Sequence, residues 1–532
     1  MRRLLVLPIV LSALVFAADA LAAPVFVIKG RGWGHSVGMS QWGAYGFAKN
    51  HDATYTQIIE HYYRPAKIGT ASGKTIGVLL ADNRMSLSIG AQSPIKVTDA
   101  TKTVTFTAGT RTARKTSTGR IAFGGKTFAD PATFSATPAI KLESTRYRGT
   151  LRVSVRNGAL RAVNWVGLEN YVKGVVPRES PDYWGDDGAQ AALEAQAVAA
   201  RSYALATGGH CGGGLFCPSI SDQVYGGYDA EIDAPNARAA VDATAGKVAM
   251  YGGKPAKTYF HSSSGGRTAA SVDVWGGDLP YLQSVRDYDL IPQNPHRLWR
   301  LNLSARTLAS RLGTGVPQDA TLTRDGSGLA QVLTVKGPGW QTPVEGSELL
   351  RGLLGVKSAR FWVGVLSLTP ARSRVTYGNS VSLDGLARPP AGDGWTAYLE
   401  RKRYGGVWKR GTNPLNVVGG AWSRTVTPGI TTWYRVTAGG VTAPASRVAL
   451  ALRVRFYEPT GTRLRGLIAP KKAGATVAVQ RRGSNGIWNT LATVSTNTAG
   501  EFAANVSVRP GRYRAIARLT GYVAGYAYLQ VG

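Results

Sequence analysis

The stretch "VGLENYVKGVVPRESPDYWGDDGAQAALEAQAVAARSYAL", from Val166 to Leu205, marks a change in the residue pattern of the chain. Its second half is rich in alanine and has acidic residues at its start, which predicts a helix because alanine has the highest helix propensity and anionic side chains stabilise a helix N-terminus. With 3.6 residues per turn, one face of that helix carries Leu193, Gln196, Ala200 and Tyr203.

The residues before this stretch read mainly as strands. From Lys74 to about Val166, short segments of alternating β-branched residues are separated by turn residues, which predicts sheet. Near the start of the chain, Val25–Ile28 predicts a strand, and "MSQWGAYGFAKN" and "TYTQIIEHYY" predict two short helices, the second capped by Thr54 or Thr56. Further on, "EGSELLRGLLGV" predicts a last helix before the strand-like "SARFWVGVL". Residues 23–365 are therefore predicted to form a strand-rich α+β domain with a few helices.

Beyond Leu366 no further helical stretch follows, and an internal repeat emerges. "YLERKRYGGVWKRG" aligns with "AVQRRGSNGIWNTL" at an offset of 80 residues, which pairs Trp408 with Trp488. Further along, "TPGITTWYRV" matches "RPGRYRAI". Two such modules of short strands and turns predict tandem all-β sandwiches of immunoglobulin-like type, over residues 366–450 and 451–532. One tryptophan per copy, flanked by strand residues, predicts that Trp408 and Trp488 are core residues, with sugar-stacking as the alternative.

Residues 1–22 have the pattern of a signal peptide. Two arginines are followed by an apolar run from Leu4 to Ala18 and by the small-residue cleavage site Ala20-Leu21-Ala22. The apolar run is short for a membrane anchor, and no later segment is long and apolar enough to span a bilayer. We therefore expect a protein that is secreted, extracellular or associated with the cell wall, and that begins near Ala23.

The charge balance predicts a polyanionic partner. Lys and Arg number 63 against 31 Asp and Glu, a formal net charge of +32. Such a field attracts nucleic acid, anionic lipid or the acidic polymers of a bacterial envelope. The basic residues are spread along the chain without a zinc-finger or helix-turn-helix signature, which argues against nucleic acid.

The two cysteines of the chain, Cys211 and Cys217, lie in "GGHCGGGLFCPS". In an exported protein this predicts one disulfide that closes a small glycine-rich loop. A metal site with His210 as a third ligand is the alternative, although the spacing is not C-x-x-C and no fourth ligand is evident nearby.

Glu179 is the candidate for proton transfer. Pro177 and Pro181 bound it, which predicts a rigid loop, and the aromatic Tyr183 and Trp184 follow. Partial desolvation would raise the pKa of this carboxyl group, so that it could donate a proton and take one back. The alternative is a surface glutamate paired with one of the abundant arginines.

These stretches resemble the SpoIID/LytB family, the sporulation stage II protein D domain of peptidoglycan-remodelling proteins. The likeness is carried by the stretch quoted first, by "SDQVYGGY" with "ATAGKVAMYGGKPAKTYFHSSSGGRTAASVDVWGGDLPYLQSVRDYD", by "EGSELLRGLLGVKSARFWV", and by "GRGWGHSVGMSQWGAYGFAKN" with "TYTQIIEHYY". Together they cover most of residues 25–365, which the resemblance identifies as the catalytic domain.

The order of these blocks departs from the family. The glycine-rich block within residues 30–63 usually closes the domain, after the "FWV"-like strand, whereas here it comes first. The domain therefore resembles a circularly permuted member, and chain termini that lie close together make such permutation possible. We expect Val25–Lys29 to lie beside Phe361–Val365, and the His35–Gln41 loop to lie near Glu179. Ser36 stands where the family signature usually has glycine.

The resemblance implies a lytic transglycosylase that cleaves the MurNAc–GlcNAc bond without water, with Glu179 as the single catalytic acid/base and no cofactor. Hydrolysis is the alternative chemistry, with Asp182, Asp186, Asp187 or Asp222 as the second carboxylate. The family motifs imply these substrate-binding residues: Arg201, Gln196, Tyr203, His35, Ser40, Gln41, Gln223, Tyr225, His261, Ser263 and Ser264.

The partners that follow are peptidoglycan glycan strands, with anionic wall polymers or an amidase as further candidates, and not nucleic acid. Two other functions are open. The protein could be a non-catalytic wall-binding or amidase-enhancing protein, which would tolerate glutamine at position 179. It could also be an adhesin-like surface protein that acts through residues 366–532.

Overall fold

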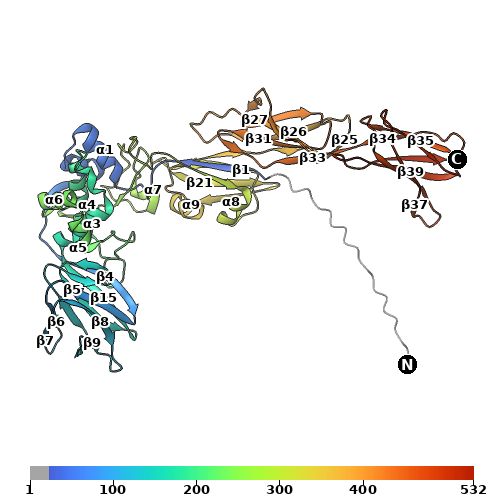
Figure 1. The fold of residues 1–532 in the computed structure, drawn as a ribbon. Helices are drawn as coiled ribbons and strands as arrows, with labels where there is room; N and C mark the ends of the chain where they lie inside the picture. Colours follow the sequence, from blue (N-terminus) through green and yellow to red (C-terminus); the bar gives the residue numbers. More distant parts are fainter. Residues whose placement is uncertain (1–22) are drawn as a thin grey trace, which may run out of the picture.

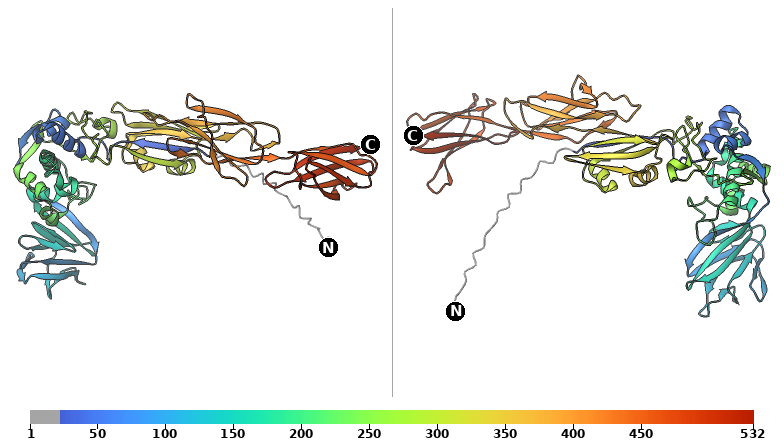
Figure 2. Two further views of the ribbon diagram at one scale, coloured as in Figure 1. Left: turned by 45° about the horizontal axis from the view of Figure 1, so that its top comes forward. Right: turned by 180° about the vertical axis from the view of Figure 1, so that it is seen from behind.

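The computed structural model describes residues 23–532, so the predicted signal peptide lies outside the described residues. Figure 1 shows an elongated, bent molecule, and Figure 2 shows the same bend from two other sides. Two sheets and a group of helices form one arm. The first strand, β1, the strands paired with it and the C-terminal modules form the other arm.

Residues 75–167 fold into two six-stranded antiparallel sheets with one core between them. The first sheet has the order β4 (Thr75–Arg84), β15 (Ala159–Gly167), β14 (Thr150–Arg156), β11 (Ala132–Ser135), β6 (Ile95–Thr98), β7 (Thr103–Phe106). The second has the order β10 (Lys126–Phe128), β9 (Ile121–Phe123), β8 (Gly109–Lys115), β5 (Ser86–Ala91), β12 (Ile140–Leu142), β13 (Thr145–Tyr147). The prediction of sheet for this region is confirmed.

The helices gather at the bend of the molecule (Figure 1). They are α1 (Gln41–His51), α2 (Tyr55–Tyr62), α3 (Leu168–Glu179), α4 (Gln190–Ala206), α5 (Gly227–Ile232), α6 (Pro235–Ala243) and α7 (Ser271–Trp275). The alanine-rich α4 lies between two apolar clusters, because small side chains on several of its faces let other helices approach closely. Thr54 caps α2 and forms a capping box with Gln57, which confirms the predicted start of this helix.

The two ends of the N-terminal part meet in one sheet. β1 (Val25–Gly30) lies between β19 (Trp299–Ser304) and β23 (Phe361–Leu366) and is antiparallel to both. In the register with β23, Val25 opposes Leu366 and Gly30 opposes Phe361, so the predicted neighbourhood of these two segments is confirmed. A hairpin sheet and two helices complete the core on one side: β20 (Asp319–Arg324), β21 (Ala330–Gly337), β22 (Trp340–Glu345), α8 (Ala305–Leu312) and α9 (Ser347–Leu354).

Residues after Leu366 contain strands and no helix. The sheet of β1 continues through β23 into β26 (Val381–Arg388), β30 (Ala421–Val426) and β29 (Val417–Val418). The opposing sheet has β25 (Arg374–Thr376), β33 (Ser446–Ala451), β31 (Thr432–Ala438), β27 (Tyr398–Arg403) and β28 (Trp408–Arg410). Two short strands pair at the edges, β24 (Thr369–Pro370) with β26 and β32 (Val441–Thr442) with β31. One sheet therefore crosses the boundary predicted at residue 365, and Val27 of β1 belongs to the core of this first module.

The second module has its own core between two sheets. One is β34 (Arg453–Phe456), β35 (Arg463–Ala469), β38 (Glu501–Asn505), and the other is β37 (Trp488–Ser495), β36 (Thr476–Arg482), β39 (Gly511–Arg518), β40 (Gly525–Val531). The all-β character of both modules agrees with the sequence, and their immunoglobulin type stays a prediction. Trp408 and Trp488 were expected in the cores, and that expectation is wrong, because both are only half-buried and lie outside the two core clusters.

Within residues 23–532, none of the helices has the length and apolar character needed to cross a bilayer.

Candidate active site

Glu179 is the last residue of α3. The predicted proline-bounded loop is wrong, because Pro177 lies inside the last turn of the helix. The buried face of α3 packs on alanines of α4 in a common apolar cluster. Gly174 gives room for the Tyr225 ring to approach α3, since a Cβ at that position would come within 2.5 Å of this ring. A packed helix, and not a loop, therefore fixes the position of Glu179.

The surroundings of Glu179 raise the pKa of its carboxyl group. Burial is the largest effect and raises this pKa above its ordinary value, while hydrogen bonds from Val224 and Gln41 act in the opposite direction. The Val224 N–H donates to Oε1 at 2.8 Å, and Nε2 of Gln41 donates to Oε2 at 3.3 Å. The C-terminal end of a helix also carries partial negative charge, which disfavours a carboxylate there. Glu179 therefore keeps its proton to a higher pH than an exposed glutamate.

A cavity of about 570 Å³ opens beside Glu179. Its wall includes Tyr203, Tyr259 and Trp275, whose rings contact one another in sequence, with centroids 5.6 Å apart for the tyrosines and 4.8 Å for Tyr259 and Trp275. Trp275 is 44% exposed. Aromatic faces of this kind are apolar platforms with polar edges, and a large pocket of this composition can hold a ligand several rings long.

Three histidines line the cavity, and the pKa values of two of them, His35 and His261, are lowered by burial. The Val37 N–H donates to Nδ1 of His35 at 3.1 Å, so Nε2 carries the proton and donates to the Phe260 carbonyl at 3.1 Å. Burial lowers the pKa of His35 to about 4. Burial also lowers the pKa of His261 well below its usual value. Nδ1 of His261 lies 3.2 Å from the Val37 carbonyl oxygen. The buried Nε2 of His261 has no hydrogen-bond partner among residues 23–532.

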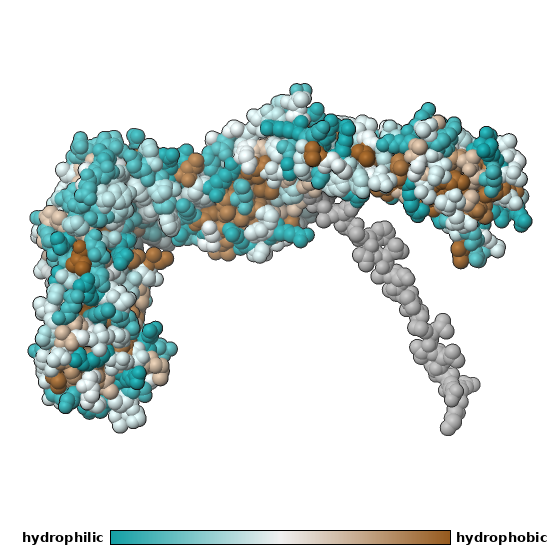
Figure 3. All heavy atoms as spheres, in the orientation of Figure 1, coloured by the Kyte–Doolittle hydropathy of each residue, from teal (hydrophilic) through white to brown (hydrophobic). Residues whose placement is uncertain are grey.

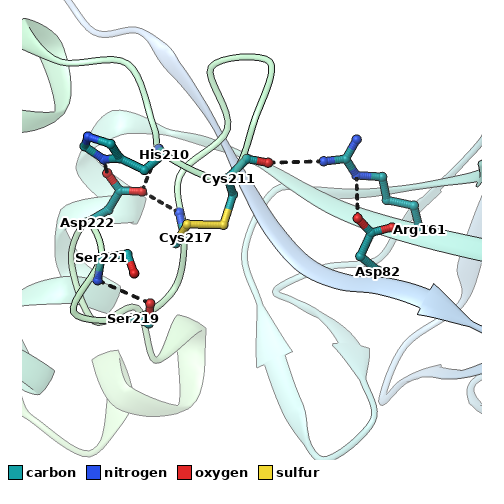
Figure 4. The surroundings of a disulfide bond; sticks show 8 residues. All are labelled: Asp82, Arg161, His210, Cys211, Cys217, Ser219, Ser221 and Asp222. Carbon is teal, nitrogen blue, oxygen red and sulfur yellow. Dashed lines mark hydrogen bonds and ion pairs between the residues drawn. A yellow bond between two sulfur atoms is a disulfide. The ribbon is translucent and has the colours of Figure 1, made fainter.

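Residues beside the disulfide loop, among them His210 and Asp222, form another part of the cavity wall, and Figure 4 shows these two residues next to the loop. Cys211 and Cys217 form a disulfide, so their thiols are not free to hold a metal ion. The part of the chain that the structure describes contains no group of three or more His, Cys, Asp or Glu side chains placed to do so. His210 and Asp222 line the cavity as a pair, with Nδ1 2.5 Å from Oδ1. The backbone N–H groups of His210 and Cys217 donate to Oδ2 of the same aspartate at 3.0 and 2.7 Å, which fixes its side chain.

Three serines named by the resemblance are structural. Ser40 caps α1 and accepts a hydrogen bond from the Gly43 N–H at 3.0 Å. Ser263 donates to Asp289 at 2.6 Å, and Ser264 donates to Asp287. All three serines are fully buried and none lines the cavity, whereas Ser262 does. Their hydroxyl groups are bonded within the protein and away from the cavity, so a role of these serines in substrate binding stays a prediction.

Arg201 is also structural. It is fully buried, forms a bidentate pair with Glu169 at 2.8 Å, and donates to the Lys247 carbonyl at 3.0 Å. Its guanidinium group is therefore occupied by the protein and is not available to a ligand.

Gln223, Tyr225 and Gln196 are buried and lie outside the cavity lining. Gln223 accepts from the Tyr171 hydroxyl at 3.1 Å, and Tyr225 donates to Asn164 at 2.9 Å. The side-chain amide of Gln196 makes no hydrogen bond with any described residue. Of the implied substrate-binding residues, the cavity therefore contains Tyr203, His35, Gln41 and His261.

Most of the aspartates considered as a second catalytic carboxylate bond to groups outside the cavity. Asp182 accepts from the Ala237 N–H at 2.7 Å, Asp186 accepts from Asn236 at 2.9 Å, and Asp187 pairs with Lys49 at 2.7 Å. None of these three lines the cavity, and only Asp222 shares it with Glu179.

Several cavity residues were not found from the sequence. Trp33, Tyr259, Trp275 and Arg351 line the wall, although each lies in or beside a block that carries the family resemblance. An aromatic residue inside such a block is a usable signal for a sugar site, but the sequence does not tell which aromatic side chains reach the surface.

Ser36, which departs from the family signature, follows the cavity residue His35 in the chain and is itself buried. It has a φ of 68°, the left-handed region that favours glycine, and its side chain is buried without a hydrogen-bond partner in the described residues. The loop therefore keeps the backbone conformation that glycine would adopt, at some cost in conformational energy.

The fold and the site together define an elongated protein whose α+β part holds one buried, protonation-prone glutamate in an aromatic cavity. A family model supplies the next step: residues 156–251, which include Glu179, match the model described as SpoIID, Stage II sporulation protein. This segment of the chain is therefore similar to the SpoIID family.

Curated relatives agree with this match. The chain is 34% identical over 191 residues to the Amidase enhancer of Bacillus subtilis, a match that covers 36% of this chain and 25% of that protein. It is 28% identical over 261 residues to Stage II sporulation protein D of the same organism, covering 45% and 72%. An uncharacterized protein of Brachyspira hyodysenteriae is 36% identical over 157 residues, covering 29% and 40%. The chain thus spans only a quarter to two fifths of the length of two of these relatives.

Among solved structures, a two-domain fibronectin type III segment of chicken tenascin aligns with 31% of this chain and 97% of its own, at 13% identity and a TM-score of 0.22.

Proposed function

We propose that this protein is an exported peptidoglycan-remodelling enzyme, and specifically a lytic transglycosylase that cleaves MurNAc–GlcNAc glycan strands to 1,6-anhydro ends. The observation that carries the proposal is Glu179 at the wall of an aromatic cavity, with a raised pKa and, among the described residues, no carboxylate hydrogen-bonded to it. Such a group can deliver a proton and recover one, which is the chemistry that a single acid/base requires.

The proposed reaction proceeds in two proton transfers. Protonated Glu179 gives its proton to the glycosidic oxygen as the bond between that oxygen and C1 of MurNAc breaks. The resulting carboxylate accepts the proton of the MurNAc C6 hydroxyl as O6 bonds to C1, which restores the acid. Because the nucleophile belongs to the substrate, no second carboxylate is needed to activate water.

Two groups support the carboxylate between these transfers. The Val224 N–H and the Gln41 amide already donate to its oxygens, so the negative charge that forms during the reaction meets preset donors. Arg351, at the cavity wall, is the cation available to a carboxylate-bearing sugar, although it is paired with Glu348 at 2.6 Å.

Export is supported by three features that point the same way: the predicted signal peptide, the disulfide between Cys211 and Cys217, and the positive net charge. Anionic polymers of the wall would attract such a protein through long-range electrostatics.

A second candidate function is amidase enhancement without cleavage of glycan. The likeness to the Amidase enhancer of Bacillus subtilis favours it, and an amidase would then be the partner. This function does not require a proton donor at position 179.

The experiment is mass spectrometry of glycan strands, with and without stem peptides, after incubation with the mature chain, with Glu179→Gln, and with Glu194→Gln as a matched control. Glu194 is a half-buried glutamate whose pKa is also raised by burial, but it lies outside the cavity. We expect anhydro-ended fragments from the native chain and from Glu194→Gln, and none from Glu179→Gln. Reducing ends would mean hydrolysis, and binding without cleavage by all three proteins would favour the amidase-enhancing function.

A further inference from the structure

One face of the first C-terminal module carries aromatic and basic side chains in register. Lys402 of β27 opposes Trp408 of β28 on one side and Trp433 of β31 on the other. Residues directly opposite one another in antiparallel strands project from the same face of the sheet. The other face of β31 carries Tyr434 and Val436 into the core, so the row of Trp408, Lys402 and Trp433 points away from the core.

A fixed arginine adjoins this row. The Arg435 guanidinium lies over the Trp408 ring, with Cζ 4.1 Å from the ring centroid, and its Nε donates to Glu400 at 2.7 Å. The two terminal nitrogens of Arg435 make no hydrogen bond with any described residue. A guanidinium held by a ring and by one carboxylate presents its remaining N–H groups in a constant direction, which suits the bidentate binding of an anion.

The second module contains the same arrangement. The Arg514 guanidinium lies over the Trp488 ring at 4.4 Å, and its Nε donates to Gln480 at 2.6 Å. Gln480 and Trp488 are the repeat partners of Glu400 and Trp408, each 80 residues further along. Both modules thus have an arginine that is stacked on a tryptophan ring and held by one side-chain hydrogen bond. It lies on the solvent-facing side of a sheet, outside the core of its module.

The charge of both modules fits an anionic ligand. Residues 366–532 contain 23 Lys and Arg against five Asp and Glu, so this third of the chain holds more than half of the net positive charge. The face of the molecule in Figure 3 shows hydrophilic side chains gathered along the upper edge of the first module, in the region of β27.

Exposed aromatic rings accompany the arginines. In the first module, a hollow of about 450 Å³ is lined by Lys402, Tyr404, Gly405, Gly406, Trp408 and Trp433. In the second module, Tyr528 is 65% exposed, and its ring centroid lies 6.0 Å from that of Trp488. Aromatic faces bind the apolar faces of sugar rings, while the arginines and Lys402 provide cations beside them.

We infer that the arginine–tryptophan faces of the two modules are binding sites for an acidic polysaccharide. Its sugar rings lie on the aromatic side chains, and its carboxylates are bound by the free ends of Arg435 and Arg514. Because both sites belong to one chain, a polymer long enough to reach both would bind with a higher overall affinity. This inference is independent of the reaction proposed for Glu179.

The test measures binding of the mature chain to polygalacturonate, with neutral dextran, polyglutamate and duplex DNA as comparison ligands. We expect Arg435→Gln combined with Arg514→Gln to weaken polygalacturonate binding about tenfold, because two bidentate anion contacts are lost. The matched control is Arg424→Gln combined with Arg463→Gln, which removes two exposed arginines from the other sheet of each module. We expect the control to weaken binding by about twofold, as loss of diffuse attraction would.

Lysine variants separate stacking from charge. Arg435→Lys with Arg514→Lys keeps both charges but loses the planar fork, and we expect most of the tenfold loss to remain. Equal weakening by the test and control pairs would overturn the inference, since the attraction would then be diffuse. Dextran binding as tight as polygalacturonate binding would also overturn it, and so would tighter binding to polyglutamate or DNA. These outcomes are independent of whether Glu179 cleaves glycan.

Discussion

Glu179 is subject to opposing influences, and their balance sets the pH range in which it can act. Burial raises the pKa of its carboxyl group, and the hydrogen bonds from Val224 and Gln41 lower it by a smaller amount. In the reaction proposed here Glu179 must hold its proton at the start, so we expect a rate that is constant below this pKa and falls about tenfold per pH unit above it. The raised pKa therefore moves the alkaline limit of activity upward.

Removing one hydrogen-bond donor to Glu179 should shift the alkaline limit of activity to still higher pH. Gln41→Leu deletes the hydrogen bond to Oε2 and leaves that of Val224, so the carboxylate loses stabilisation and its pKa rises. We expect the alkaline limb of the pH–rate profile to move up by about half a unit or less, because the lost bond is long. The measurement is kcat/KM for glycan strands against pH. An unchanged limb, or a shift to lower pH, would show that another group controls it.

At the scale of secondary-structure elements, the disulfide loop holds one wall of the cavity in place. The bond between Cys211 and Cys217 closes a short glycine-rich segment between His210 and Asp222, and both of these residues line the cavity (Figure 4). Three glycines within the loop have positive φ, so the segment has many alternative conformations once the bond is broken.

Breaking this bond should lower activity while leaving the fold intact. We expect Cys211→Ser combined with Cys217→Ser to reduce the cleavage rate about ten- to a hundredfold, since small displacements of positioning groups have effects of this size. A reducing agent should do the same to the native chain and nothing further to the variant. Circular dichroism serves as the control for folding. Full activity of the variant would show that the wall is positioned without the bond.

The same scale shows what the sequence could predict. Strands between Lys74 and Val166 and the helices α1, α2 and α4 follow from local patterns. Helix α3 does not, because Gly174, Pro177 and its valines disfavour a helix locally. It forms since Val172, Val175 and Val176 are buried against α4. Likewise, a run of three serines cannot reveal that Ser262 faces the cavity while Ser263 and Ser264 bind buried aspartates, because the turn of the backbone decides it.

At the scale of the whole molecule, the order of the elements links the cavity to the modules. β1 and β23 are antiparallel neighbours, and Val25 opposes Leu366 at the end of the ladder. A two-residue turn would suffice to join these ends, which is how β23 would lead into β1 in the usual order of the family. In this chain no turn joins β23 to β1. The chain instead continues from β23 into the first module, whose β26 pairs with β23. A single sheet thus connects the first C-terminal module to the strand that precedes the cavity loop.

We propose that this order arose by circular permutation, and a direct comparison of sequences tests it. Aligned with Stage II sporulation protein D of Bacillus subtilis by a dot plot, the chain should give two diagonals in exchanged order. Residues 25–63 should match a segment that follows, in that protein, the one matched by residues 361–366. The register of β1 against β23 is compatible with this order, because Leu366 opposes Val25 and a short turn between them would join the two strands into a hairpin. One continuous diagonal would mean that the glycine-rich block belongs at the front of the family fold, and that the pairing of β1 with β23 has another origin.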